Sequence, residues 1–205
     1  MSASAEGGDR FTAAIAAIDA VNAQDPTHER HHGEAGEAEM PSALLYGQRV
    51  SAWLLRLAPD ASEELRLAAR AQHIARWKIP RSSYPDGRDG YLAWRSALAR
   101  FHAETAGEIL SRCGYGDETV ARVGSLLQKR GLKRDAEVQA LEDAACLVFL
   151  ENQFAGFATK HADEKVVDIL RKTVAKMSSE GVAEAMKLGA KLPATARALI
   201  ARALG

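Results

Sequence analysis

The sequence has few of the residues that mark disulfide-bonded, membrane-spanning or nucleic-acid-binding proteins. Its two cysteines, Cys113 and Cys146, lie far apart and fit no metal-ligand or redox spacing, so free thiols in a reducing compartment are expected. No apolar run reaches the roughly 18 residues that a membrane span needs. Lys and Arg together number 27, as do Asp and Glu, so no basic excess points to nucleic acid. The first residues show no signal-peptide pattern, and a cytoplasmic protein is expected.

What is present favours a compact helical protein. The chain has 205 residues, 47% of them apolar and only six of them proline, with no alternating strand pattern. We therefore predict an all-α fold, a single-domain helical bundle over residues 1–205. Residues 1–8 are predicted to be a disordered tail and residues 23–40 a long loop, with the helices of 163–205 packed on the core.

Helical periodicity and end signals divide the chain further. The second helix is expected to start near Pro41 and to end before Pro59, and Gly114 and Gly116 are expected to end the fourth. The other predicted helices cover residues 9–21, 63–77, 91–113, 117–129, a segment from 135, 163–179, 182–188 and 194–204.

The predicted loop at 23–40 holds three histidines. His28, His31 and His32 could share a metal ion if the segment were helical. Its acidic and glycine-rich composition favours a solvated loop instead, and we leave them outside the predicted site.

The segment from Arg76 to Arg100 is locally basic. It has six basic residues against two acids, interleaved with four aromatic rings. Guanidinium groups suit phosphate and aromatic faces suit a stacked ring, so the segment predicts a small anionic ligand. The alternative is that its arginines form salt bridges to Asp86, Asp89 and Glu104. The predicted substrate-binding residues are Gln72, Arg76, Arg81, Tyr84, Arg88 and Lys129.

Polar side chains are also expected within apolar helical segments at two places in the sequence, at His102 and at Glu142–Asp143. His102 shares a helical face with Leu98, Ala106 and Ile109, as a ligand or as a hydrogen-bonded core histidine would. Glu142 and Asp143 directly precede the run 144–149, which is apolar on every side and predicts a buried helix. Buried carboxylates need partners, whereas acids in an exposed first turn would only complement the helix dipole. Both alternatives are open from the sequence.

The chain resembles a bacterial and fungal family of unknown function over nearly its whole length. The motifs that carry the resemblance are YGQR, ARAQHIARWKIPRSSYP, GYLAWR and LEDAACLVFLE. Some members are labelled glutamyl-tRNA synthetase, because QHI at 72–74 and KMSS at 176–179 are similar to the signatures of those enzymes. The chain is too short and too helical for the nucleotide-binding domain that those signatures require, and we reject the label.

A remote resemblance links the chain to the metal-dependent HD phosphohydrolases. The segment 68–76 resembles the helix that presents their adjacent His and Asp, with Gln72 in the place of that His and His73 in the place of that Asp. Tyr46 stands near the place of their first His. The resemblance implies one divalent metal (zinc, manganese or iron) held by His73, His102 and Asp143, with Glu142 as a ligand or general base.

The function predicted from the sequence is a metal-dependent phosphohydrolase, or a degenerate relative that only binds a small phosphorylated molecule. The alternative is a non-catalytic ligand-binding or interaction module on the same scaffold. Contact with RNA through the basic aromatic segment is disfavoured by the neutral overall charge.

Overall fold

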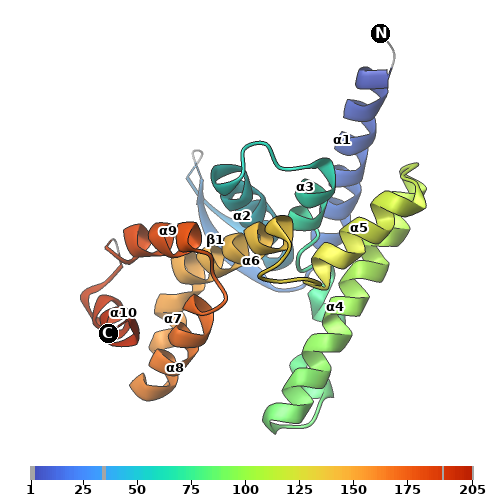
Figure 1. Ribbon diagram of the computed structural model, residues 1–205. Coiled ribbons are helices and arrows are strands. Elements are labelled where there is room, and N and C mark those ends of the chain that lie inside the picture. The colour runs from blue at the N-terminus through green and yellow to red at the C-terminus, as the bar shows by residue number, and fades with distance from the viewer. Residues whose placement is uncertain (1–2, 34–35, 191, 205) are drawn as a thin grey trace. The chain divides into compact units, whose positions relative to one another are not determined.

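The computed structural model describes residues 3–33, 36–190 and 192–204, which are mainly helical (Figure 1). These ranges contain ten α-helices and one two-stranded sheet, so the predicted all-α class is confirmed. None of the described helices combines the length and the apolar composition that crossing a bilayer requires. The chain divides into two compact units, Met1–Ser51 with Ala61–Arg130, and Ala52–Asp60 with Gly131–Gly205. That the two form one domain stays a prediction.

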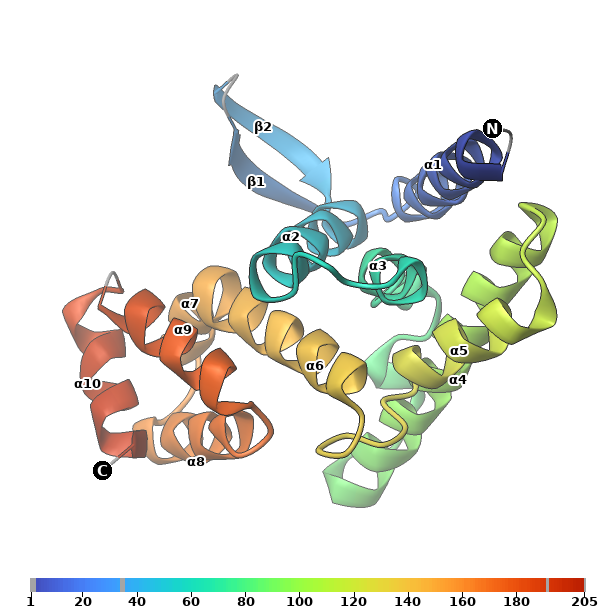
Figure 2. The ribbon, with the colours of Figure 1, turned by 45° about the horizontal axis from the view of Figure 1, so that its top comes forward.

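The first unit contains α1 (Ala3–Asn22), most of α2 (Ser42–Leu57), α3 (Glu63–Arg70), α4 (Gly87–Arg112) and α5 (Asp117–Leu127). Helices α4 and α5 lie side by side and are joined by a short turn (Figure 2). The core side chains of this unit are aliphatic and fully or almost fully buried: Ile18, Leu45, Leu65, Leu67, Ile74, Leu98, Leu110 and Leu126. Their spacing is the helical periodicity from which the helices were predicted.

Two predictions for the N-terminal region are wrong. Helix α1 begins at Ala3, so residues 3–8 of the predicted disordered tail are helical, while residues 1–2 lie outside the described ranges. The predicted loop at 23–40 contains a β-hairpin of β1 (His28–Gly33) and β2 (Gly36–Pro41), paired antiparallel. Asp25 fastens its base, because one carboxylate oxygen accepts from the Thr27 amide and the other from the Ala43 amide, at 2.9 Å each. The hairpin was missed because its strands are built from charged residues and histidines rather than apolar ones.

The third and fourth predicted helices have different ends from those expected. Helix α3 ends at Arg70 instead of Trp77, and residues 71–75 form turns before the short 3₁₀ helices η1 (Arg76–Lys78) and η2 (Arg81–Ser83). The change of direction is completed at Ala75, which has a left-handed φ of 50° and whose amide donates to Asn22 Oδ1 at 3.2 Å. Helix α4 begins at Gly87, four residues before the predicted start. Residues 71–86 therefore form a connection between α3 and α4 that is longer than predicted.

The second unit is formed by α6 (Ala136–Val148), the π-helix η3 (Phe149–Gln153), α7 (Phe154–Ala158), α8 (Asp163–Val174), α9 (Ser179–Gly189) and α10 (Ala194–Leu204), with the end of α2. Asp135 caps α6 by accepting from the amides of Glu137 and Val138. The predicted burial of the run 144–149 is confirmed for Ala144, Cys146, Leu147 and Val148, whereas Ala145 and Phe149 are half-buried. Helix α8 ends before the predicted Ser179, because Ser178 is the N-cap of α9.

Candidate functional site

His102 connects α4 with the turn that follows α3. Its side chain is 4% exposed, and Nδ1–H donates to the carbonyl oxygen of Ile74 at 2.7 Å. The other ring nitrogen, Nε2, is buried and has no hydrogen-bond partner among the residues that the structure describes. Burial lowers the pKa of His102 to about 4; the bond to Ile74 raises it, and the charges of Arg76 and Arg95 lower it further. At neutral pH, Nε2 therefore carries a free lone pair.

His73 lies in the turn next to His102. Its ring stacks on Tyr46 from α2, with centroids 4.0 Å apart and planes at 10°, and its centroid is 5.9 Å from that of His102. Burial holds the pKa of His73 well below its usual value, and the nearby charges add to this effect in the order Arg76, His102, Lys129 and Arg95. The two histidines are thus neutral rings in a region of positive potential.

Arg76 supplies the nearest of these positive charges. Its Cζ lies 4.7 Å above the ring of Trp94, whose Nε1 donates to the carbonyl oxygen of Ile79 at 2.9 Å. Burial and the charge of Arg95 lower the pKa of Arg76 below its usual value, and the guanidinium nevertheless stays a cation at neutral pH. Within the described ranges, no carboxylate lies within ion-pairing distance of Arg76 or Arg95.

We refer to six residues of this region as the cationic cluster: Gln72, His73, Arg76, Arg95, His102 and Lys129. Gln72 is 4% exposed, and its buried Oε1 has no partner in the described part of the chain. Left-handed backbone at non-glycine residues occurs at three described positions: Ala75, beside the cluster, Lys129, within it, and Lys133, outside it, with φ of 50°, 55° and 71°. Such strain is often stored at functional sites, so it supports the choice of this region.

The basic loop after the cluster is held closed by its own arginine. Arg81 donates through Nη1 to Tyr84 O and through Nη2 to Pro85 O, at 2.8 Å each, and Asp86 Oδ1 lies 4.0 Å from Nη2. The predicted alternative, arginines engaged within their own loop, thus describes Arg81. Arg88 is exposed, and no hydrogen bond or ion pair joins it to the cluster in the described structure. That Arg81, Tyr84 and Arg88 contact substrate stays a prediction.

The two carboxylates of α6 belong to the second unit, and both are buried, at 4% exposed for Glu142 and 3% for Asp143. The alternative that they lie in an exposed first turn is wrong, because α6 is buried over nearly two turns from Leu141 onward. Asp143 accepts three hydrogen bonds, from Ser178 N at 2.9 Å, Ser178 Oγ at 2.6 Å and Gln139 Nε2 at 3.0 Å. It thereby anchors the start of α9. Glu142 Oε1 lies 3.9 Å from Lys176 Nζ.

These positions bear on the predicted metal ligands. His73 and His102 belong to the first unit and Asp143 to the second, so their sharing of one ion stays a prediction. Among the residues that the structure describes, no three His, Cys, Asp or Glu side chains form a group that could hold a metal. The lone pair of His102 Nε2 fits a metal ligand, whereas the three donors to Asp143 already occupy both its oxygens.

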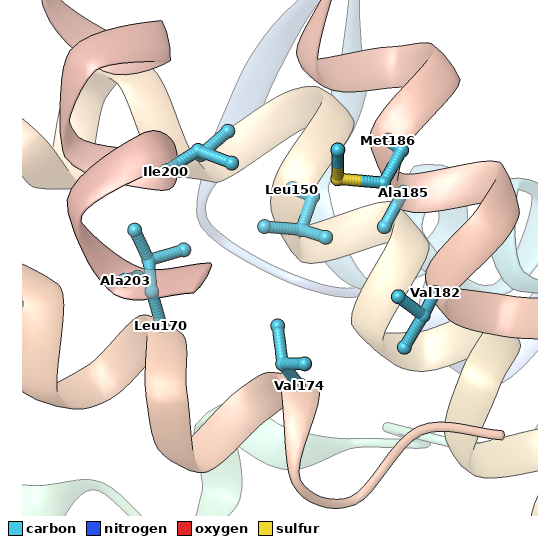
Figure 3. Close-up of a pocket in the computed structure, with 8 residues that line it drawn as sticks. All are labelled: Leu150, Leu170, Val174, Val182, Ala185, Met186, Ile200 and Ala203. Carbon is cyan, nitrogen blue, oxygen red and sulfur yellow. The ribbon is translucent and has the colours of Figure 1, made fainter. Parts of the chain in front are cut away.

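A small pocket in the second unit has no polar or charged side chain that could bind a metal or a phosphate. Figure 3 shows side chains from η3, α8, α9 and α10 converging around it, and every one of them is apolar. Its volume of about 20 Å³ has room for about one water molecule. Without a polar group to orient a ligand, this pocket is a packing defect of the helical core.

The predicted site residues included neither Tyr46 nor Arg95, although the HD resemblance placed Tyr46 near a ligand position and Arg95 was one of the six basic residues of the segment 76–100. Tyr46 is far from His73 in sequence, and no local pattern predicts their stacking. Arg95 could have been found, because Tyr91, Arg95 and His102 follow one another at spacings of four and seven on one face of α4.

The lowered pKa of His102 predicts a pH dependence of stability. The unfolded state takes up a proton near pH 6.5, but the folded state does so only near pH 4. The stabilisation is therefore complete above about pH 6.5 and is lost as the pH falls through about 4. The free energy of unfolding in urea is measured at pH 7 and at pH 4.5 for each protein. Its fall between the two pH values should be smaller in His102→Asn than in the wild type, by up to about 3 kcal/mol. His28→Asn, on the exposed hairpin, is the control; equal losses in all three proteins would refute the buried neutral ring.

A family model matches the chain over nearly its whole length. Residues 12–200 match a family described as a domain of unknown function, DUF4202. No curated protein and no solved structure matches the chain significantly. The HD resemblance therefore stays an inference from sequence motifs. Because the match spans nearly the whole chain, the protein belongs to the DUF4202 family.

Proposed function

We propose that the cationic cluster binds the phosphate group of a small phosphorylated molecule. One observation carries the proposal: Arg76 and Arg95 raise the positive potential around two neutral histidines, and no carboxylate in the described ranges pairs with either guanidinium. A partly buried cation without a counter-ion is unfavourable. A bound anion supplies that counter-ion, and it relieves the repulsion between the two arginines.

The geometry of Arg76 suits a phosphate group, with its several oxygen atoms, better than it suits a monatomic anion. Its guanidinium lies over Trp94, so one face is covered and the N–H edge is available for two parallel hydrogen bonds. The amide of Gln72 and the ring nitrogens of the histidines add polar groups that can serve a protonated phosphate oxygen. The arginines would neutralise the charge of the ligand, and the neutral polar groups would orient it. This combination favours a phosphate monoester or a similar small anion.

Hydrolysis of that phosphorylated molecule is a second candidate function. It is favoured by the bond from His102 Nδ1–H to Ile74 O, because metal-binding histidines commonly use one nitrogen in this way and the other as ligand. His73 and His102 would hold a zinc, manganese or iron ion, which would activate water. Asp143 as a third ligand and Glu142 as a ligand or general base rest on the HD resemblance alone, because Asp143 already accepts three hydrogen bonds within its own unit. Without the metal, the same cluster would be a binding module.

Metal content separates the two candidates. Hydrolysis predicts about one equivalent of divalent metal in protein purified without chelator or reloaded with zinc, manganese or iron. The His102→Asn variant should then lose it, as measured by inductively coupled plasma mass spectrometry. If the wild type takes up none of the three metals, the hydrolase candidate fails and phosphate binding alone is left.

Phosphate binding is tested by calorimetric titration of inorganic phosphate and pyrophosphate at constant ionic strength. Arg76→Gln should raise the Kd by at least about tenfold, because it removes charge-assisted hydrogen bonds. Arg100→Gln is the matched control, since Arg100 is an exposed arginine of α4 that lies outside the cluster, and it should leave the Kd unchanged. Each variant must show a wild-type circular dichroism spectrum. Absence of binding to the wild type, or equal Kd values in both variants, would contradict the proposal.

A further inference from the structure

One large aromatic side chain, Tyr91, is exposed beside the cationic cluster. In the described structure, four large hydrophobic residues are strongly exposed, and two of these are neighbours at the start of α4. Tyr91 is 45% exposed and Leu92 is 50% exposed. An exposed aromatic ring next to guanidinium groups that lack a carboxylate partner in the described ranges offers a face on which the ring of an anionic ligand can stack.

Tyr91 lies next to the groups that we propose to bind phosphate. Its ring centroid is 5.9 Å from that of Trp94, with the planes tilted by 49°, and Trp94 is the ring that supports Arg76. The Tyr91 hydroxyl is also close enough to Arg76 to raise the pKa of the guanidinium. Arg76 and Tyr91 therefore lie against the same Trp94 ring, so a ligand whose phosphate binds Arg76 lies near Tyr91.

The backbone under Tyr91 is held in place by the preceding loop. The carbonyl oxygen of Pro85 lies too close to Gly90 to leave room for a β-carbon, so only glycine allows the loop to pack on the first turn of α4. Arg81 ties the same loop through its bonds to the carbonyl oxygens of Tyr84 and Pro85. The ring of Tyr91 is thus presented by a braced helix start, which lowers the entropy cost of binding against it.

We propose that the phosphorylated ligand carries a flat aromatic or heteroaromatic ring, which stacks on Tyr91 while its phosphate binds Arg76 and Arg95. This inference rests on the proposed function and names the substrate class of the same site. The ring would have to be joined to the phosphate directly or through a short linker such as a sugar. Inorganic phosphate and aliphatic phosphates would bind the charged part of the site only.

The test compares ligands that share the phosphate and differ in the ring. Calorimetric titrations would use inorganic phosphate, ribose 5-phosphate, phenyl phosphate and several nucleoside monophosphates, each ligand titrated separately. Stacking on one aromatic side chain should tighten binding of a ring-bearing ligand by roughly five- to a hundredfold over ribose 5-phosphate. Preference for phenyl phosphate or for a nucleotide then identifies where the ring stands relative to the phosphate.

Variants of Tyr91 show whether the preference comes from this ring. In Tyr91→Ala the ring-bearing ligands should bind no better than ribose 5-phosphate, whereas Tyr91→Phe should keep the preference. Leu92→Ala is the control for the loss of an exposed apolar side chain and should also keep it. The inference is overturned if wild-type protein binds ring-bearing ligands and ribose 5-phosphate equally, or if Tyr91→Ala keeps the full preference. If no phosphate compound binds, the proposed function falls as well, so the two failures are distinguishable.

Discussion

The hydrogen bond from His102 Nδ1–H to the carbonyl oxygen of Ile74 is the contact on which the candidate site depends. It joins the middle of α4 to the turn that follows α3, and so brings the histidine of one element beside the Gln72–His73 pair of another. Because Nδ1 is used for this bond, Nε2 is the nitrogen that stays unpaired in the buried interior. The left-handed backbone at Ala75 belongs to the same arrangement, since it directs the chain from the turn into η1 and places Arg76 over Trp94.

Charge is distributed unevenly in a chain whose formal net charge is zero. Many arginines outside the site have carboxylate partners, such as Arg70 with Asp19 at 2.7 Å and Arg49 with Glu29 at 3.0 Å. Arg76 and Arg95 have no such partner in the described ranges, although they lie beside two histidines whose pKa values they depress. A protein that neutralises surface charges but leaves a partly buried arginine unpaired is arranged for an anion from solution. Asp143 shows the opposite case, with donors from its own unit on both carboxylate oxygens.

The sequence predicted those features that depend on local periodicity and failed where distant contacts decide. The burial of His102 and of Val148 followed from helical spacing, and both are confirmed. The end of α3 did not, because the apolar pattern continues past Arg70 and the turn at Ala75 lacks the glycine that usually marks left-handed backbone. Within the cluster, Arg76 was expected from the local basic excess alone. Its support by Trp94 and the stacking of His73 on Tyr46 come from tertiary packing, which no spacing encodes.

The central claim is that two neutral histidines stand at a phosphate-binding cluster, and imidazole ¹⁵N NMR tests it most directly. Spectra of the labelled protein at pH 7 report the protonation of each ring nitrogen, and the His102 signals are assigned by their absence in His102→Asn. We expect a neutral His102 protonated on Nδ1, with an unprotonated Nε2 whose shift moves on titration with inorganic phosphate. A doubly protonated His102 at pH 7, or imidazole shifts at His73 and His102 that do not respond to saturating phosphate, would contradict it.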